Sequence, residues 1–281
     1  MLAGLLLALL PADLPPQAMT FRGPHDWTFE ASVHVPEDSS GPAVLLIGGG
    51  IGNDLDWTAP GTLLIDGTSE QITMTGEAHA DAPRIAKPLV DRGCMVMHYS
   101  TIARDDPKRD RYPYEVGMID PREHMDLARA AMDALAAHPE ATQRPLVVLG
   151  FSMGAQRAVQ LACERDAIAA IVLLSGAQMT AAGPRDGGTP LPTHDKFGLP
   201  IGEAILKDLK RPTLVLYGDL DDTHRRHAPR LADRWPWVDV RLLPEIGHQL
   251  GPEQDGRIGP IDTSVCDMVA TWVCEAAGER K

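Results

Sequence analysis

Runs of consecutive apolar residues recur along the chain and predict a mostly parallel β-sheet. The runs are β-forming and lie at 43–47, 94–99, 145–149, 169–174 and 213–217. Apolar residues at successive positions, instead of alternate ones, are typical of strands that are covered on both faces. Phe29 to Val35 alternates apolar and polar residues, as an outer strand does, and Val238 to Leu243 completes the predicted sheet.

Helical patterns alternate with these strands. Apolar residues recur at helical spacing from Ala82 to Arg92, with Asp81 as the expected N-cap, and Asp120-Pro121 is a strong start for a helix to about His138. Further helices are expected at 155–165, 223–235 and 261–277. Strands that alternate with helices indicate an α/β fold with helices on both faces of the sheet. We predict one such domain over residues 21–281, with no interdomain linker.

The sequence Gly150-Phe-Ser-Met-Gly154 follows the apolar run 145–149 and precedes a helical pattern. A serine between two glycines on a sharp strand-to-helix turn is the nucleophile elbow. The turn holds the serine in a strained conformation, and glycines at 150 and 154 remove side chains that would collide there. Ser152 is therefore the predicted nucleophile for attack on an acyl carbon.

A serine hydroxyl needs a base to take its proton. His248 is the predicted base, because it lies in a glycine-flanked loop after the last strand, at the edge of the sheet where the elbow also lies. His224 and His227 are expected near a helix start, in contact with solvent. Asp221, after the strand 213–217, is the predicted acid that orients His248. Its neighbours remain alternatives, although Asp219 is expected to stabilise the turn and Asp222 to cap a helix.

The oxyanion that develops during acyl transfer needs hydrogen-bond donors. The N–H of Met153, directly after the serine, is one predicted donor. The second is expected from the glycine loop after the strand 43–47, with Gly50 preferred over Gly49. Three stretches are expected to shape the substrate site: 54–80, with a hairpin of Thr62–Ile65 and Gln71–Met74, the loop after Ser100, and an excursion over the site at 177–210.

Cofactor and metal chemistry have little support in the sequence. The loop Gly48-Gly-Gly-Ile-Gly-Asn53 fits a dinucleotide fingerprint until its last position, but no helix is predicted to open there. A phosphate-binding P-loop motif and a His-Glu-x-x-His metal motif are both missing from the sequence. We therefore predict neither a cofactor nor a metal.

Composition and charge bear on which partners the protein can bind and on the cellular compartment in which it is found. The formal net charge of −13 disfavours nucleic acid and anionic membranes as partners. The four cysteines form no Cys-x-x-Cys pair and are expected to be buried free thiols, in preference to a disulfide or metal site. Leu2 to Leu10 is an apolar run too short to span a bilayer. It favours an export signal within residues 1–20 over a cytoplasmic protein, although no basic residue precedes it.

From Phe29 onward the chain resembles the α/β-hydrolase superfamily. The elbow, Gly218-x-x-Asp221 and Gly247-His248 stand in that family's order. The segment Leu45 to Asp56 resembles bacterial esterases of the dienelactone-hydrolase-like and acyl-peptidase-like groups, which commonly have His-Gly-Ser-Gly-Pro-x-Asp-Arg-Asp there. Gly48 replaces that histidine, and Ile51 and Leu55 also depart from the pattern. The serine at 152 separates the chain from cysteine-dependent dienelactone hydrolases and from dehalogenases that use an aspartate.

The sequence thus predicts a serine hydrolase that cleaves a carboxylic ester of a small-molecule substrate through an acyl-enzyme. A peptidase or amidase acting with the same three residues is one alternative. A binding protein without catalysis on this fold is another. The substrate and the oligomeric state do not follow from the sequence.

Overall fold

The computed structural model describes residues 15–37, 40–49, 55–59, 62–64, 71–74, 79–106, 121–176, 209–221, 235–254 and 257–278. An eight-stranded sheet forms its centre, in the order β1-β2-β8-β3-β9-β10-β11-β12. The bounds of these strands are β1 Gln17–Arg22, β2 Thr28–His34, β3 Ala43–Ile47, β8 Met95–Tyr99, β9 Leu146–Phe151, β10 Ile168–Leu174, β11 Thr213–Gly218 and β12 Val238–Leu243.

Six of the eight strands are parallel. The run from β8 to β12 pairs in parallel, whereas β1 and β2 pair with antiparallel partners at one edge. Every residue of β3, β8, β10 and β11 is buried, as expected for strands covered on both faces. This confirms the predicted parallel sheet. The edge strand β1 did not follow from the apolar pattern.

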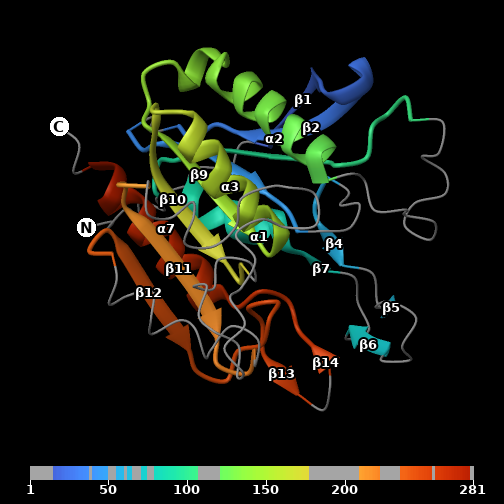
Figure 1. The fold of residues 1–281 in the computed structure, drawn as a ribbon, viewed down its shortest axis with the longest axis vertical. Helices are drawn as coiled ribbons and strands as arrows, with labels where there is room; N and C mark the ends of the chain where they lie inside the picture. Colours follow the sequence, from blue (N-terminus) through green and yellow to red (C-terminus); the bar gives the residue numbers. More distant parts are fainter. Residues whose placement is uncertain are drawn as a thin grey trace, which may run out of the picture.

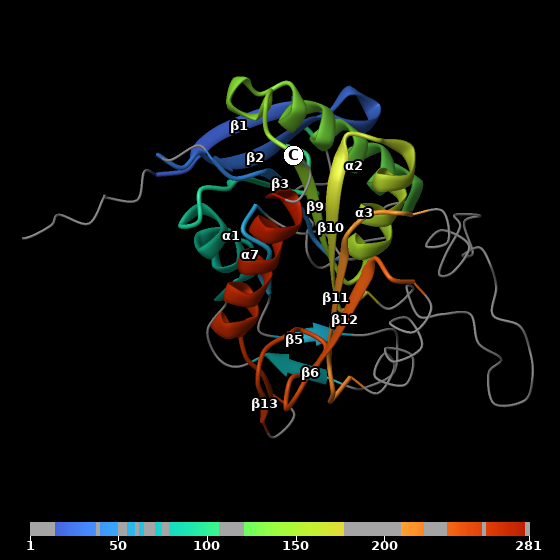
Figure 2. The ribbon, with the colours of Figure 1, turned by 90° about the vertical axis from the view of Figure 1, so that its left-hand side faces the viewer.

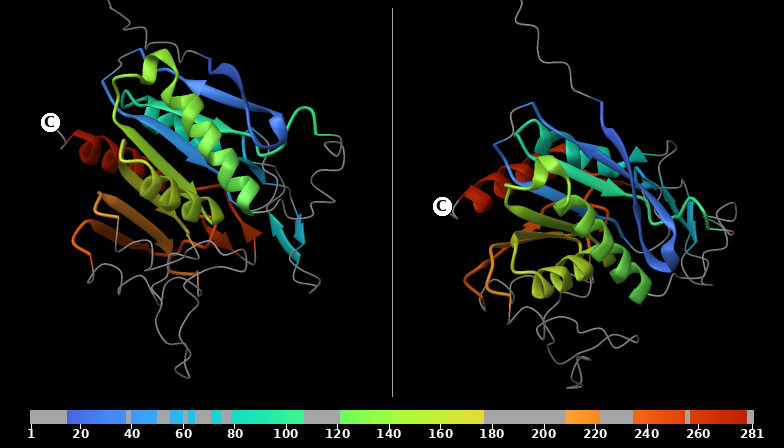
Figure 3. Two further views of the ribbon diagram at one scale, coloured as in Figure 1. Left: turned by 45° about the horizontal axis from the view of Figure 1, so that its top comes forward. Right: turned by 90° about the horizontal axis from the view of Figure 1, so that it is seen from above.

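Helices cover both faces of the sheet (Figures 1 and 2). The helix bounds are α1 Asp81–Val90, α2 Pro121–Ala136, α3 Met153–Glu164 and α7 Thr263–Gly278. One hydrophobic core lies between the sheet, α2 and α3, and a second lies between the sheet, α1 and α7. Figure 3 shows the same layers from other directions, with α2 and α3 on one face. Of the predicted helices, 223–235 falls almost entirely outside the described residues.

The expected N-cap of the first helix is wrong. The cap position is Ala80, which makes no side-chain capping bond, and Asp81 is the first helical residue. The Asp81 carboxylate instead accepts a hydrogen bond from the backbone N–H of Ile261 at 3.2 Å. The Asp81 side chain, which the local pattern assigned to the cap, is thus engaged in a contact with a residue 180 positions away.

Small strands extend the structure beyond the carboxyl ends of the parallel strands (Figures 1 and 2). The predicted hairpin is confirmed as β5 Thr62–Leu64 paired with β6 Gln71–Met74. A second hairpin, β13 Glu253–Gln254 with β14 Arg257–Ile258, joins it through β6, and β4 Thr58–Ala59 pairs with β7 His79–Ala80. None of the helices in the described ranges has the length and apolar character needed to cross a bilayer.

A pair of histidines is packed beside Leu55. The backbone carbonyl of Leu55 can only accept, so the Nδ1–H of His98 donates to it, at 2.7 Å. In the neutral ring the Nε2 of His98 is then an acceptor, and the Nε2–H of His34 donates to it at 3.1 Å. His98 is buried, with 1% of its surface exposed. Both rings are therefore held neutral.

This pair makes the fold sensitive to acid. Burial and then the nearby His98 lower the pKa of His34 from 6.5 to about 4. A histidine with a lowered pKa binds its proton less readily in the folded state than in the unfolded state, so folding loses stability as pH falls from 6.5 toward about 4. We expect the urea midpoint to drop over this range, and to drop less in His34→Gln. An equal drop in both proteins would contradict this account.

Candidate active site

Ser152 occupies a strained position between β9 and α3. Ser152 has φ 51° and ψ −117°, a conformation that few residues other than glycine adopt. Its backbone N–H donates to the carbonyl of Leu174 on the adjacent strand at 2.8 Å. The strain is thus held by the sheet, which fixes the direction of the Ser152 side chain.

The two glycines of the motif allow strand and helix to approach. A Cβ at Gly150 would lie 2.3 Å from the carbonyl oxygen of Gly154, and a Cβ at Gly154 would lie 2.2 Å from that of Ile47. Real Cβ atoms do not come so close, because backbone atoms at these positions cannot move aside. The expectation that these glycines prevent collisions at the turn is therefore confirmed by the geometry.

The structure brings Ser152, Asp221 and His248 together. The Nδ1–H of His248 donates to the Asp221 carboxylate at 2.7 Å, since a carboxylate can only accept. The unprotonated Nε2 then faces the Ser152 hydroxyl, which donates to it at 3.2 Å. The Asp221 side chain is 6% exposed and that of His248 is 34% exposed. The acid is thus shielded from water, whereas the imidazole stays open toward the serine.

Backbone contacts hold the Asp221 loop against the His248 loop. Leu220 N–H donates to the carbonyl of Ile246 at 3.1 Å, and Asp219 N–H donates to the carbonyl of Leu243 at 2.9 Å. The Nδ1 contact of His248 is with Asp221, not with Asp219. This geometry favours Asp221 among the candidate acids. Asp222, the third candidate, lies outside the described residues, as do His224 and His227.

Gly218 permits the close approach of the Asp221 loop to the His248 loop, a role that the sequence pattern alone did not reveal. A Cβ there would lie 2.0 Å from the carbonyl oxygen of Ile246, two residues before His248. Gly218→Ala is therefore expected to push the histidine loop away from Asp221 and to lower turnover that depends on Ser152, His248 and Asp221 about 100-fold.

Gly278 provides the matched control for this substitution, because no atom of the described residues, apart from its own helix backbone and chain neighbours, lies within 4 Å of a Cβ built there. Gly278→Ala should leave activity and the melting temperature as they are. Steady-state kinetics and thermal melts of both variants make the comparison. Full activity in Gly218→Ala would show that the close approach of the two loops is not needed.

Several further side chains lie around the three residues. The ring of Phe151 lies against the imidazole of His248, with centroids 6.0 Å apart. Burial, and then the charge of Asp221, raise the pKa of Tyr217, so its hydroxyl stays protonated and donates to the carbonyl of Gly176 at 3.3 Å. Ser175, at the end of β10, is also buried and has a positive φ of 48°. The sequence did not predict that these three residues lie at the site, because their residue types alone carry no signal.

The predicted oxyanion donors are described only in part. Met153 is the first residue of α3, where backbone N–H groups have no partner within the helix. Gly49 lies beside Ser152, because a Cβ there would be 3.4 Å from Cβ of Ser152. Gly50, the preferred second donor, falls outside the described residues, and so do 177–208, most of the predicted excursion. Within the described ranges, no cluster of three His, Cys, Asp or Glu side chains could hold a metal ion.

Comparison with solved structures identifies the fold. A dienelactone hydrolase from Anabaena variabilis aligns with a TM-score of 0.61 at 17% identity, over 92% of this chain and 97% of that one. The esterase Est1E from Butyrivibrio proteoclasticus aligns with a TM-score of 0.56 at 16% identity, over 93% of this chain and 98% of that one. A Pyrococcus furiosus esterase aligns with a TM-score of 0.56 at 14% identity, over 94% of this chain and 92% of that one. The chain has the α/β-hydrolase fold.

Sequence comparison adds no closer relationship. No protein-family model matches the chain, and no curated protein matches it. The likeness to dienelactone hydrolases and esterases is therefore one of fold, as the resemblance seen in the sequence predicted.

Proposed function

We propose that this protein is a serine hydrolase that cleaves a carboxylic ester through Ser152, His248 and Asp221. The observation that supports this most strongly is the continuous chain of hydrogen bonds from the Asp221 carboxylate through the His248 imidazole to the Ser152 hydroxyl. A serine and a histidine within reach, with the histidine oriented by a buried acid, form the arrangement that activates a serine nucleophile. The similar folds include esterases.

The first half-reaction forms an acyl-enzyme. Ser152 Oγ attacks the ester carbonyl carbon while Nε2 of His248 takes the hydroxyl proton. Asp221 holds Nδ1–H, which keeps the imidazole in the required tautomer and stabilises the imidazolium. The imidazolium then returns the proton to the leaving alkoxide, and the alcohol departs.

The carbonyl oxygen becomes negative during this attack and needs donors fixed in advance. The N–H of Met153 is suited to this role, because it is unpaired within α3 and lies at the positive end of the helix dipole. The loop after β3 supplies the second donor, from Gly50 or from Gly49, which lies beside Ser152. The absence of a side chain at either position lets the backbone approach the substrate.

The second half-reaction releases the acid. Water enters the site, His248 takes one of its protons, and the resulting hydroxide attacks the acyl carbon. The tetrahedral intermediate collapses, the carboxylic acid leaves, and the proton returns to Ser152. The 34% exposure of His248 gives water a route to the imidazole.

A substrate panel tests the proposed bond type. The full-length protein is assayed with p-nitrophenyl esters of increasing acyl length and with matched p-nitroanilides. We expect ester turnover to exceed amide turnover, because an amide needs protonation of a poorer leaving group. Turnover of the anilides with no turnover of the esters would show an amidase and contradict the ester assignment.

A further inference from the structure

Two cysteines that are far apart in the sequence lie side by side in the fold. Cys94 directly precedes β8, and Cys274 lies in the last part of α7. Their Sγ atoms are 3.7 Å apart and share a hydrogen bond, although the residues are separated by 180 positions. Both are free thiols. This contact was not expected from the spacing of the cysteines.

Their surroundings differ in a way that distinguishes the two thiols. Cys94 is fully buried and Cys274 is half-buried. Cys163, by contrast, is exposed, which makes the prediction of buried thiols wrong for that residue. A thiol at the surface can meet an oxidant from solvent, whereas a buried thiol can react only with a neighbour.

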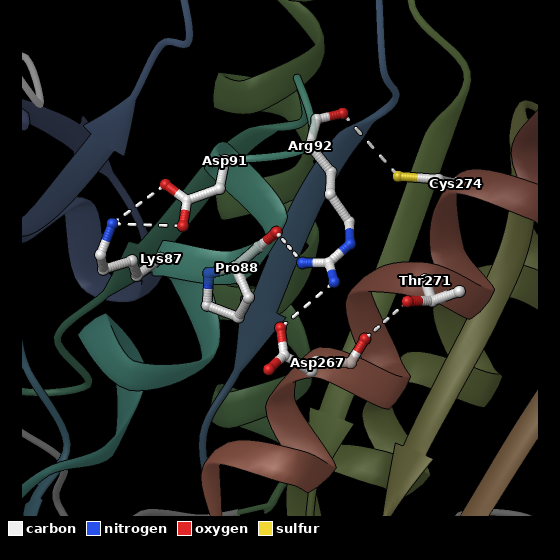
Figure 4. Close-up of polar contacts among 7 residues, drawn as sticks. All are labelled: Lys87, Pro88, Asp91, Arg92, Asp267, Thr271 and Cys274. Atoms are coloured by element: carbon white, nitrogen blue, oxygen red, sulfur yellow. Dashed lines mark hydrogen bonds and ion pairs between the residues drawn. The ribbon is translucent and has the colours of Figure 1, made fainter. Parts of the chain in front are cut away.

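Arg92 lies next to the half-buried thiol. The Cys274 thiol faces the carbonyl oxygen of Arg92, at 3.9 Å (Figure 4). The Arg92 guanidinium donates to the carbonyl of Pro88 at 3.0 Å and to the Asp267 carboxylate at 3.2 Å. These contacts hold the guanidinium beside Asp267, seven residues before Cys274 in α7, whereas the Arg92 backbone carbonyl lies at the thiol.

We propose that Cys94 and Cys274 are a site of disulfide formation that fastens α7 to the turn between α1 and β8. In a disulfide the sulfur atoms are about 2.0 Å apart. The present 3.7 Å separation must therefore shorten by about 1.7 Å for the bond to form. The end of α7 is a suitable place for such a change, because the helix ends four residues later, at Gly278.

The reaction needs an oxidant, for which a low-molecular-weight disulfide suffices. The hydrogen bond with Cys94 and the charge of Arg92 lower the pKa of Cys274, which makes it the first nucleophile. Its thiolate attacks the small disulfide, forming a mixed disulfide and releasing one small thiolate. Cys94 then attacks Sγ of Cys274, and its proton passes to the second small thiolate, which leaves as a thiol. Two protein thiols are oxidised and one small disulfide is reduced to two thiols.

The bond would close a loop that contains the whole candidate site. Ser152, Asp221 and His248 all lie between Cys94 and Cys274 in the sequence. A crosslink over a long loop stabilises the folded state mainly by restricting the unfolded chain. We therefore expect the oxidised protein to melt about 5–10 °C above the reduced protein.

Oxidation of the full chain tests the site. The protein is equilibrated with mixtures of oxidised and reduced glutathione, free thiols are alkylated in denaturant, and intact mass and peptide mapping follow. We expect two of the four thiols to be lost, a Cys94–Cys274 linked peptide, and the rise in melting temperature. Cys163→Ser, a change at an exposed thiol, should show the same link and the same rise.

Cys274→Ser is the variant that removes the site, by a nearly isosteric change at a half-buried position. It should form no intramolecular link, and its melting temperature should not respond to glutathione. Four free thiols in the wild-type protein under oxidising conditions would overturn the proposal. A stable glutathione adduct on Cys274 would overturn it too, because that result would show that Cys94 cannot reach the mixed disulfide.

Discussion

Replacement of Ser152 by alanine is expected to lower ester turnover by about 10⁴- to 10⁶-fold. The change removes the only atom that is proposed to form the acyl bond, and it leaves His248 without the hydroxyl that faces its Nε2. Binding energy and the oxyanion donors remain, so a small residual rate above that of water is expected. Kinetics with a short-chain p-nitrophenyl ester measure the effect.

The fold should survive this substitution. Alanine differs from serine only by the hydroxyl, and the Ser152 backbone is held by its hydrogen bond to Leu174 and by the close packing at Gly154. Circular dichroism and the melting temperature should therefore match the wild-type values. Retained turnover in a folded Ser152→Ala protein would remove this residue from the mechanism.

Replacement of Asp221 by asparagine is expected to lower turnover by about 10⁴-fold. In the unsubstituted protein the carboxylate accepts a hydrogen bond from the Nδ1–H of His248 at 2.7 Å, which leaves Nε2 without a proton and free to take that of the serine. An asparagine amide would donate to Nδ1 and stabilise the opposite tautomer, in which Nε2 carries the proton. The imidazole would then be unable to act as the base.

Asp219→Asn is the matched control, because it makes the same chemical change two residues away in the same loop. The Asp219 backbone joins the loop to β12 through its N–H, and this contact does not involve the side chain. We expect its effect on turnover to remain within about threefold. A larger loss in Asp219→Asn than in Asp221→Asn would exchange the roles of the two carboxylates.

The fold was predictable where local pattern and burial agree. The run Ala43–Ile47 is apolar throughout because both faces of β3 are covered, and its bounds came directly from the sequence. Asp120-Pro121 likewise predicted the start of α2 at Pro121. Residues Gln17–Arg22 gave no such signal, because β1 is an edge strand with mostly exposed side chains. Its pairing with β2 is decided by contacts that no local pattern contains.

The site was predictable where the turn demands particular residues. The glycines around Ser152 are required by the tight crossing of β9 and α3, and the order of serine, acid and histidine followed from strand exits. The choice among neighbouring aspartates depended on the backbone bonds between two loops. Gly218 and the Cys94–Cys274 contact also depend on segments that meet only after folding. The spacing of residues along the sequence does not show which distant segments come into contact.

Labelling with a fluorophosphonate probe tests the central claim most directly, because the probe reacts only with a serine that its surroundings have activated. The native full-length protein is incubated with the probe, and the site of modification is mapped by peptide mass spectrometry, with heat-denatured protein as the control. We predict one adduct, on Ser152, in the native protein and none after denaturation. Native protein without an adduct at Ser152 would contradict the proposed hydrolase and favour a binding protein on the same fold.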